Sequence, residues 1–376
     1  MTKVSRRSFV KNMSLGVGAT TVLPTLLSFE NIAKDILPAY QGKKLNIALC
    51  GLGRYANILA KGLQETSYCR LAGIITGTPE KAQSWKKKYA IPEGNIYDYQ
   101  NFDDIKNNKD IDLVYVVLPN GMHKEYTIRA AKAGKHVIVE KPMALNAKDC
   151  EEMIDVCKKA GVQLAVGYRL HYEPHHIEIS RLGQEKVFGP VRLIESSLGF
   201  NMEGMDPDDW HFNKPLSGGG PLMNLGIYAI QSSRYVLGEE PISVTAQFGP
   251  KLMGDLSKEV EESVTWQLNF PSGAVCTSTT TSNCYIDRFY ASASKGYFEL
   301  SPAISYGPFK GRTSEKEFDF PTINQQAAQM DGISKLILED TQLPSHIRGE
   351  EGLKDMRVID AVYNAAATGK RVTMNQ

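Results

Sequence analysis

The chain has 376 residues, which is long enough for two domains with separate cores after a short leader is set aside. Its 43 basic and 42 acidic side chains give a formal net charge of +1 and are interspersed along the sequence. This balance excludes an acidic tail and argues against a nucleic-acid-binding surface. We therefore expect no nucleic-acid partner.

The N-terminal segment, residues 1–30, has the pattern of an export signal. Arg6 and Arg7 are followed by Phe9, Lys11 and a weakly hydrophobic run, which is the twin-arginine address. The run is interrupted by glycine and proline and is shorter than the roughly 20 residues of a spanning helix. A basic helix and a single membrane anchor are the alternatives. We expect a periplasmic or otherwise exported protein, membrane-anchored if the signal stays uncleaved, with residues 31–43 as an arm.

The first domain is predicted over residues 44–166. A short apolar strand, Leu45–Cys50, leads into the turn GLGRYA and then into a helix with an apolar repeat. In this G-x-G-x-x-A turn Gly51 allows the sharp bend, Gly53 lets backbone approach a diphosphate, and Ala56 lets the helix lie close to the sheet. The backbone amides at the start of that helix would then face the negative charge of the diphosphate.

The strand–helix unit repeats along the same domain, which strengthens the dinucleotide-binding interpretation. Near-continuous apolar strands that alternate with helices predict an α/β fold with a doubly wound parallel sheet, the Rossmann fold. The further strands are expected at residues 70–77, 112–119 and 136–142, with helices at 79–90 and 123–134.

The end of the second strand indicates which dinucleotide is bound. An NAD site usually carries an acidic residue about 20 positions after the glycines, but this chain has TGTPEK there. The hydroxyl of Thr76 and the cations of Lys81 and Arg54 suit a 2′-phosphate, so NADP is favoured and NAD stays possible. The alternative is that Lys81 is only solvated on its helix.

The segment Glu140-Lys141-Pro142 closes the fourth strand. Functional groups of open parallel sheets gather at the carboxyl ends of the strands. Lys141 is therefore expected in the crevice that receives nicotinamide. A solvated edge lysine is the alternative.

The second domain, residues 167–376, has a different pattern of polar and apolar residues. Serine and threonine alternate with apolar residues at 191–200, 242–248, 262–270 and 274–282, which predicts an open, mostly antiparallel sheet with one packed and one wet face. The glycine loop at 218–220 leads into a helix on which Asn224 and Tyr228 would share one face. The domain is therefore expected to be α+β.

Polar and aromatic side chains gather after the last predicted strand of the first domain, as expected of a sugar site. His175 and His176 on the following helix are expected on its surface. A metal site made of His171, His175 and Asp209 is an alternative, but no metal is favoured because nothing fixes their geometry. The gathered residues are Tyr168, Arg169, His171 and Tyr172.

Several further motifs resemble the Gfo/Idh/MocA family of oxidoreductases, and within it the glucose–fructose oxidoreductase branch. The similarity extends from Leu45 to the C-terminal end. The motifs are L-P-N-x-x-H at 118–123, A-G-K-H-V-x-x-E-K-P at 133–142, G-Y-R-x-H-Y-x-P at 167–174, G-G-G-P-L-M-x-x-G-I-Y at 218–228 and R-Y-x-x-G-E-E-P at 234–241.

The resemblance implies a second domain that roofs the cofactor, a C-terminal helix packed back on the first domain, and a homodimer or homotetramer formed through the open sheet. It implies catalytic roles for Lys141, Tyr228 and Asn224. It also implies a set of cofactor contacts and a set of substrate contacts. The cofactor contacts are Gly51, Gly53, Arg54, Tyr55, Ala56, Thr76, Lys81, Leu118, Pro119, Asn120, His123, Glu140, Lys141 and Arg169. The substrate contacts are Tyr168, Arg169, Trp210, His211 and Asn224.

Asn224 departs from the family pattern, in which this position is commonly Asp. An amide cannot exchange a proton at neutral pH, so Lys141 and Tyr228 are left to handle protons, with the ammonium lowering the pKa of the phenol. The expected activity is NADP-dependent hydride transfer to or from a sugar, with retained cofactor and a ping-pong cycle. Two alternatives stay open: a glycosidase that oxidises its substrate transiently, and a nucleotide- or sugar-binding protein without catalysis.

Overall fold

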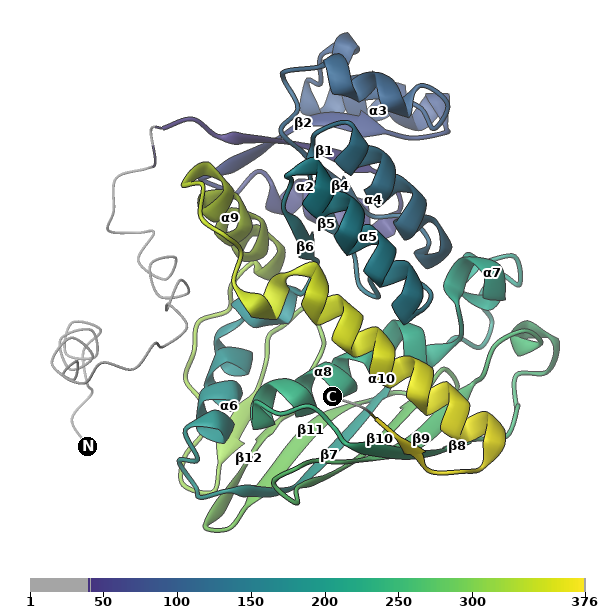
Figure 1. Ribbon diagram of the computed structural model, residues 1–376, viewed down its shortest axis with the longest axis vertical. Coiled ribbons are helices and arrows are strands. Elements are labelled where there is room, and N and C mark those ends of the chain that lie inside the picture. The colour runs from purple at the N-terminus through teal and green to yellow at the C-terminus, as the bar shows by residue number, and fades with distance from the viewer. Residues whose placement is uncertain (1–39, 41, 375–376) are drawn as a thin grey trace, which may run out of the picture.

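The computed structural model describes residue 40 and residues 42–374, so the predicted export signal lies outside the described residues. Two sheets, one above the other in Figure 1, form the frame of the molecule. The upper sheet belongs to the first domain and the lower sheet to the second. The expected two-domain architecture is confirmed.

The upper sheet has six parallel strands in the order β3-β2-β1-β4-β5-β6. Strands β1 to β3 are added towards one edge of the sheet and strands β4 to β6 towards the other. The point at which this order switches, between β1 and β4, lies beside the glycine turn. The two-residue strand β3 was not predicted. The strands are β1 (Leu45–Cys50), β2 (Cys69–Ile75), β3 (Ile96–Tyr97), β4 (Leu113–Val116), β5 (His136–Val139) and β6 (Leu164–Val166).

Helices cover both faces of this sheet, as the doubly wound prediction requires. Alternate residues of β1 point to opposite sides: Ile47 and Leu49 pack in one buried cluster, and Ala48 and Cys50 pack in the other. The first cluster takes side chains from α2 (Arg54–Gly62), α3 (Pro79–Tyr89) and α9 (Gln325–Leu338), and the second from α4 (His123–Lys132) and α5 (Ala147–Ala160). Cys150 and Cys157 of α5 are buried free thiols.

The lower sheet has eight strands in the order β13-β12-β11-β7-β10-β9-β8-β14, and only its central pair β7–β10 is parallel. Its strands are β7 (Val191–Gly199), β8 (Ser243–Phe248), β9 (Ser263–Asn269), β10 (Val275–Thr281), β11 (Ile286–Ala293), β12 (Gly296–Leu300), β13 (Gly311–Thr313) and β14 (Val372–Thr373).

One face of the lower sheet is packed and the other is wet. Helices α6 (Pro174–Gln184) and α8 (Ile227–Leu237) lie between it and the upper sheet (Figure 1). On the packed side Val264, Trp266 and Leu268 are buried, whereas the alternating Thr265 is exposed. The predicted alternation is therefore confirmed.

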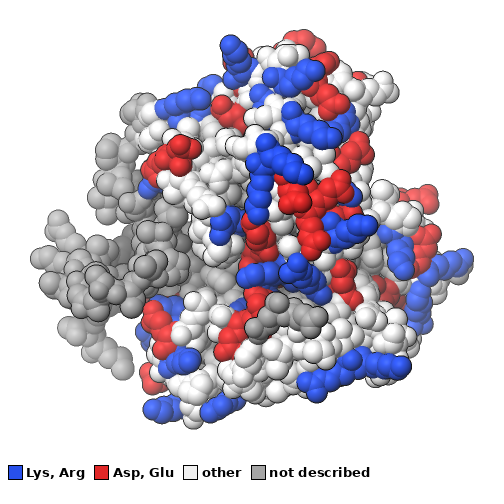
Figure 2. Space-filling model, in the orientation of Figure 1, with Lys and Arg blue, Asp and Glu red and all other residues white. Residues whose placement is uncertain are grey.

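Helix α10 (Gly349–Thr368), yellow in Figure 1, spans both layers and packs on α5 and β8. The carboxylate of Asp360 accepts a hydrogen bond of 2.9 Å from the backbone N–H of Ala147 at the start of α5. Acidic and basic side chains are interspersed along this face of the molecule (Figure 2). Within residues 42–374, no helix is both long and apolar enough to cross a membrane.

Candidate active site

The glycine turn fits the diphosphate of a dinucleotide. Gly51 has φ +99°, and a Cβ there would come within 2.6 Å of the carbonyl oxygen of Val117. Gly53 is extended, and a Cβ there would meet nothing within 4 Å, so open space lies above the turn. Helix α2 begins at Arg54 with no acidic residue in its first turn, which leaves its amides open to an anion.

The end of β2 lies beside this turn, because the N–H of Gly51 donates to the carbonyl oxygen of Ile75 at 2.9 Å. Thr76 follows and is buried, and its hydroxyl accepts a 3.3 Å hydrogen bond from the N–H of Thr78. Arg54 and Lys81 are exposed. Hydroxyls and cations thus stand where an NAD site would carry a carboxylate, and they fit a 2′-phosphate.

Lys141 meets the second domain at the carboxyl end of β5. Its Nζ donates to the backbone carbonyl oxygen of Asn224 at 2.8 Å and lies 4.8 Å from the ring centroid of Tyr228. Burial lowers the pKa of this lysine to about 8; Glu140 opposes the shift and the cation of Arg169 adds to it. An amine with such a pKa exchanges protons near neutral pH.

Glu140 faces the interior of the first domain. Its Oε1 accepts a 2.6 Å hydrogen bond from the hydroxyl of Tyr115, and that hydroxyl accepts one of 2.8 Å from Gln329 of α9. A Cβ at Gly167 would come within 2.5 Å of the same carboxylate oxygen. The structure thus places Glu140 against Tyr115 and beside Lys141, where it favours the charged form of the lysine; its contact with the cofactor stays a prediction.

Arg169 is 3% exposed and is held by the segment that follows β12. Its guanidinium donates to the carbonyl oxygens of Ile304 and Ser305 and to the side chain of Gln325. The same group lies 5.4 Å from the ring centroid of Tyr228 and 4.7 Å from that of Tyr306. Arg169 therefore joins this segment to the candidate catalytic phenol.

The expected lowering of the Tyr228 pKa by Lys141 is wrong. Burial raises the pKa of Tyr228, the cation of Arg169 opposes this shift, and Glu140 adds to it. The lysine lies over the face of the ring, in a cation–π contact. At neutral pH the side chain is therefore a protonated phenol that can donate a hydrogen bond.

Asn224 and Tyr228 line different hollows, and Lys141 contacts both residues, the first at its backbone carbonyl oxygen and the second over its ring. Residues 222–226 form a π turn before α8 begins, and the wider turn rotates the helix start relative to a regular helix. The carboxylate of Glu261 accepts hydrogen bonds from the N–H groups of Gly220 and Leu222 at 2.9 and 3.1 Å and so holds this start.

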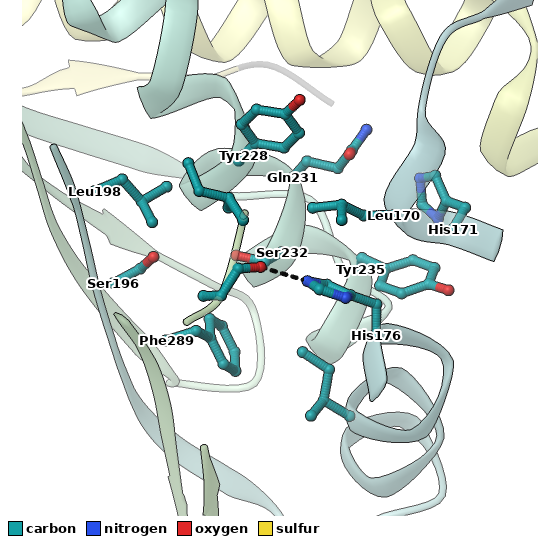
Figure 3. A pocket seen from close by; sticks show the side chains of 13 residues that line it. Leu170, His171, His176, Ser196, Leu198, Tyr228, Gln231, Ser232, Tyr235 and Phe289 are labelled. Carbon is teal, nitrogen blue, oxygen red and sulfur yellow. Dashed lines mark hydrogen bonds between the residues drawn. The ribbon is translucent and has the colours of Figure 1, made fainter. Parts of the chain in front are cut away.

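The hollow behind Tyr228 lies between α6, α8 and the lower sheet and has about 430 Å³ of empty space. Figure 3 shows Tyr228, Gln231 and Tyr235 on successive turns of α8, with His176 hydrogen-bonded to the carbonyl oxygen of Ala303 at 2.7 Å. The hollow is thus lined mainly by aromatic and apolar side chains.

Asn224 opens into a second hollow, of about 460 Å³, together with Trp210 and His211. The ring of His211 stacks on that of Trp210 at 3.8 Å and lies 2.5 Å from the carboxylate of Asp209. Burial lowers the pKa of His211, Asp209 opposes the shift, and the cation of Lys141, which bonds to the backbone of Asn224, adds to it. The structure therefore brings together three predicted substrate contacts and the predicted catalytic lysine.

Two residues that the sequence predicted to contact the substrate or the cofactor make their hydrogen bonds within the protein. The hydroxyl of Tyr168 bonds to the buried Asp355 at 2.5 Å, and the ring is 1% exposed, which removes it from the crevice. Each ring nitrogen of His123 lies 2.8 Å from a carbonyl oxygen, that of Leu118 or that of Pro142. His123 thus ties the loop after β4 to the loop after β5.

Asn120 also makes an interdomain contact, because its amide donates to the carbonyl oxygen of Ser217 at 2.8 Å. Leu118 is buried and Pro119 half-buried beside it. These residues therefore hold the glycine loop of the second domain against the strand ends of the first.

His175 and His176 are buried, which corrects the prediction that they lie on the surface. Their Nδ1 atoms lie 2.8 and 2.9 Å from the carboxylate of Glu173, which also caps α6. Within residues 42–374, no three His, Cys, Asp or Glu side chains come together as a metal site.

Sequence reasoning missed several side chains that complete the site. Tyr115 belongs to an apolar strand, Gln329 and Gln325 to α9, Glu261 to a loop and Tyr306 to the segment after β12. None lies within a motif, and each meets its partner through the tertiary fold.

A two-domain dinucleotide-dependent oxidoreductase is the class of protein that this fold and crevice define. Residues 45–168 match the family described as "Oxidoreductase family, NAD-binding Rossmann fold", and residues 176–299 match "GFO/IDH/MocA C-terminal domain". The chain therefore belongs to the Gfo/Idh/MocA family, and its first domain is the NAD(P)-binding domain.

Characterised relatives include D-xylose 1-dehydrogenase [NADP(+)] of Haloarcula marismortui, which is 26% identical over 88% of this chain and 93% of that protein. The 1,5-anhydro-D-fructose reductase of Ensifer adhaerens is 27% identical over 75% of this chain and 85% of that protein. Among solved structures, aldose–aldose oxidoreductase from Caulobacter crescentus superimposes with a TM-score of 0.85 and 41% identity over 88% of this chain and 100% of that one. These similarities extend over both domains.

Proposed function

We propose that the protein is an NADP-dependent oxidoreductase that transfers hydride to or from a sugar or sugar-derived substrate. The meeting of Lys141 with Tyr228 and Asn224 at the strand ends carries this proposal. The similarity to an aldose–aldose oxidoreductase and to an NADP-dependent xylose dehydrogenase supports the substrate class. The nicotinamide, when bound, accepts or supplies hydride at its C4.

Lys141 handles the proton in this proposal. In the oxidative direction its neutral amine takes the proton of the sugar hydroxyl while the carbon loses hydride. In the reductive direction its ammonium donates that proton to the carbonyl oxygen. One N–H of Lys141 is held by the carbonyl of Asn224, so two donors remain for the substrate oxygen.

The neighbouring side chains orient the sugar. Tyr228 donates a hydrogen bond from its phenol, and the amide of Asn224 both donates and accepts. The indole of Trp210 offers an apolar face for stacking. Since Asn224 cannot ionise, it orients a hydroxyl and leaves proton transfer to the lysine.

The dinucleotide is held at the glycine turn by the amides of α2, and its 2′-phosphate by Thr76, Arg54 and Lys81. We propose that it stays bound while two sugars in turn reduce and reoxidise it. We further propose that the twin-arginine segment directs export of the folded, loaded protein, and that the wet face of the lower sheet joins copies of the chain into a homo-oligomer.

The proposal is tested with purified protein and a panel of aldoses, ketoses and glycosides, followed by the absorbance of reduced nicotinamide. Formation of NADPH with an aldose, and its loss on adding a second sugar, would support the ping-pong cycle. Cofactor that is removed completely by dialysis would contradict the cycle, though not the oxidoreductase. Cleavage of aryl glycosides without net reduction would favour a glycosidase.

A further inference from the structure

An aromatic contact crosses between the two domains beside the glycine turn. The rings of Tyr55 and Tyr306 are stacked, with centroids 6.4 Å apart and planes inclined by 28°. Tyr55 lies in the first turn of α2, directly after the turn that fits the diphosphate. Tyr306 lies in the segment 301–310, which links β12 to β13.

The base of this segment is firmly fixed. The carboxylate of Asp287 accepts hydrogen bonds from the N–H groups of Ala303 and Ile304 at 2.7 and 2.8 Å. Arg169 donates to the carbonyl oxygen of Ser305 at 3.0 Å. Three successive residues before Tyr306 are therefore tied to the second domain, so the position of its backbone is set independently of Tyr55.

The tip of the segment 301–310 is more exposed to solvent than its base. Tyr306 is 53% exposed, although one side of its ring packs on the guanidinium of Arg169 at 4.7 Å. Gly307 follows with φ +89°, which glycine adopts at little cost. A fixed base with an exposed aromatic tip can open through rotation of the side chain, without unfolding the segment.

We propose that the Tyr55–Tyr306 pair is a latch across the cofactor crevice, and that Tyr306 is a positioning residue that sets the rate at which NADP(H) leaves. The inference rests on the proposed function, because it requires the dinucleotide at the glycine turn. A diphosphate at the start of α2 would lie beside Tyr55, which occupies the first turn of that helix. Departure of the dinucleotide therefore requires the pair to separate.

The latch is coupled to the candidate catalytic residues through Arg169. The guanidinium packs on Tyr306 on one side and lies 5.4 Å from the ring centroid of Tyr228. The carbonyl oxygens of Ile304 and Ser305 also hold this guanidinium, so the closed latch adds a cation–π contact to a group that is already fixed beside the phenol.

The test measures the dissociation of preloaded NADPH, displaced by excess NADP⁺ and followed by the fluorescence of reduced nicotinamide. Loss of one aromatic pair predicts a dissociation rate on the order of tenfold faster in Tyr306→Ala and in Tyr55→Ala. The double variant should be no faster than about either single one, because both remove the same contact. Tyr306→Phe keeps the ring and should stay within about twofold of the parent.

Tyr285→Ala is the matched control, since Tyr285 is a 70% exposed tyrosine just before β11. Thermal unfolding of each variant checks that the fold is retained. An unchanged rate in Tyr306→Ala, or effects of the two alanines that multiply, would overturn the latch alone. A parent protein that binds no NADPH would overturn the proposed function and the latch together.

Discussion

The Nζ of Lys141 donates to the backbone carbonyl oxygen of Asn224 at 2.8 Å and so joins residues 83 positions apart across the two domains. Because the acceptor is a backbone atom, the contact does not depend on which side chain occupies position 224. A substitution there changes the charge around the lysine while the lysine keeps its anchor. The site therefore allows position 224 to be tested separately from the placement of Lys141.

Asn224→Asp is expected to move the pH dependence of turnover to higher pH. A carboxylate close to the ammonium favours its charged form and raises the pKa of Lys141 by about 1–3 units. The measurement is kcat/KM for sugar oxidation across pH, for the parent and the variant. Asn224→Ser serves as the uncharged control, and a shift of equal size in that variant would contradict the electrostatic cause.

Lys141→Met is expected to lower kcat for sugar oxidation by about 10²–10⁴-fold, the usual contribution of a general acid–base group. NADPH binding, measured by fluorescence titration, should persist because the glycine turn is untouched. Lys132→Met, an exposed lysine in the last turn of α4, is the control. Full activity of Lys141→Met would remove the proposed mechanism.

The parent enzyme should show opposite pH profiles in its two directions. With the pKa of Lys141 lowered to about 8, the amine is protonated below that pH and neutral above it. Oxidation requires the neutral base and should rise with pH through about 8, whereas reduction requires the ammonium and should fall over the same range. Initial rates at saturating cofactor test this, and parallel profiles would exclude Lys141 as the group that titrates.

Thr76→Asp is expected to change the preference from NADP towards NAD. The new carboxylate would repel a 2′-phosphate and accept a hydrogen bond from a 2′-hydroxyl. The dissociation constant for NAD divided by that for NADP should fall by about tenfold or more, since 1.4 kcal/mol corresponds to a factor of ten. Thr66→Ser, a buried threonine whose hydroxyl donates to backbone carbonyls, is a control for packing.

Glu173→Gln should destabilise the fold. Burial alone would raise the pKa of Glu173, but the hydrogen bonds from His175 and His176 lower it to about 2. The charged form is therefore favoured by folding, and its contribution is present at neutral pH and is lost as the pH falls towards about 2.

Loss of one partner from a buried charged cluster costs about 3 kcal/mol or more, which denaturant unfolding at neutral pH would measure. Glu185→Gln, an exposed change just after α6, should cost at most about 1 kcal/mol. Equal stability of the two variants would contradict the structural role of Glu173.

The fold could largely be predicted from the sequence because its signals are local. The apolar strands of the first domain, the glycine turn and the alternating strand β9 each have a periodicity that a short window contains. Lys141 was found for the same reason, since the position after a parallel strand identifies a crevice residue without knowledge of its neighbours.

The features of the site that could not be predicted from the sequence depend on residues far away along the chain. His175 and His176 look like surface residues until the segment after β12 encloses them, where the ring of Phe309 packs on both and the carbonyl oxygen of Ala303, 127 positions away, bonds to His176. Tyr168 is predicted to contact a sugar, but Asp355, 187 positions away, accepts the hydrogen bond of its hydroxyl. The π turn before α8 carries no sequence periodicity of its own, so this wider turn at the start of the helix could not be foreseen.

The packing of α10 against α5 has a consequence for biosynthesis. The backbone N–H of Ala147 finds its acceptor, Asp360, 213 positions later in the chain. During elongation, the nascent first domain must therefore wait for the second domain to emerge before this flank is covered. Until then the side of α5 that α10 covers stays exposed, and the crevice between the two domains is completed only when the C-terminal helix has been made.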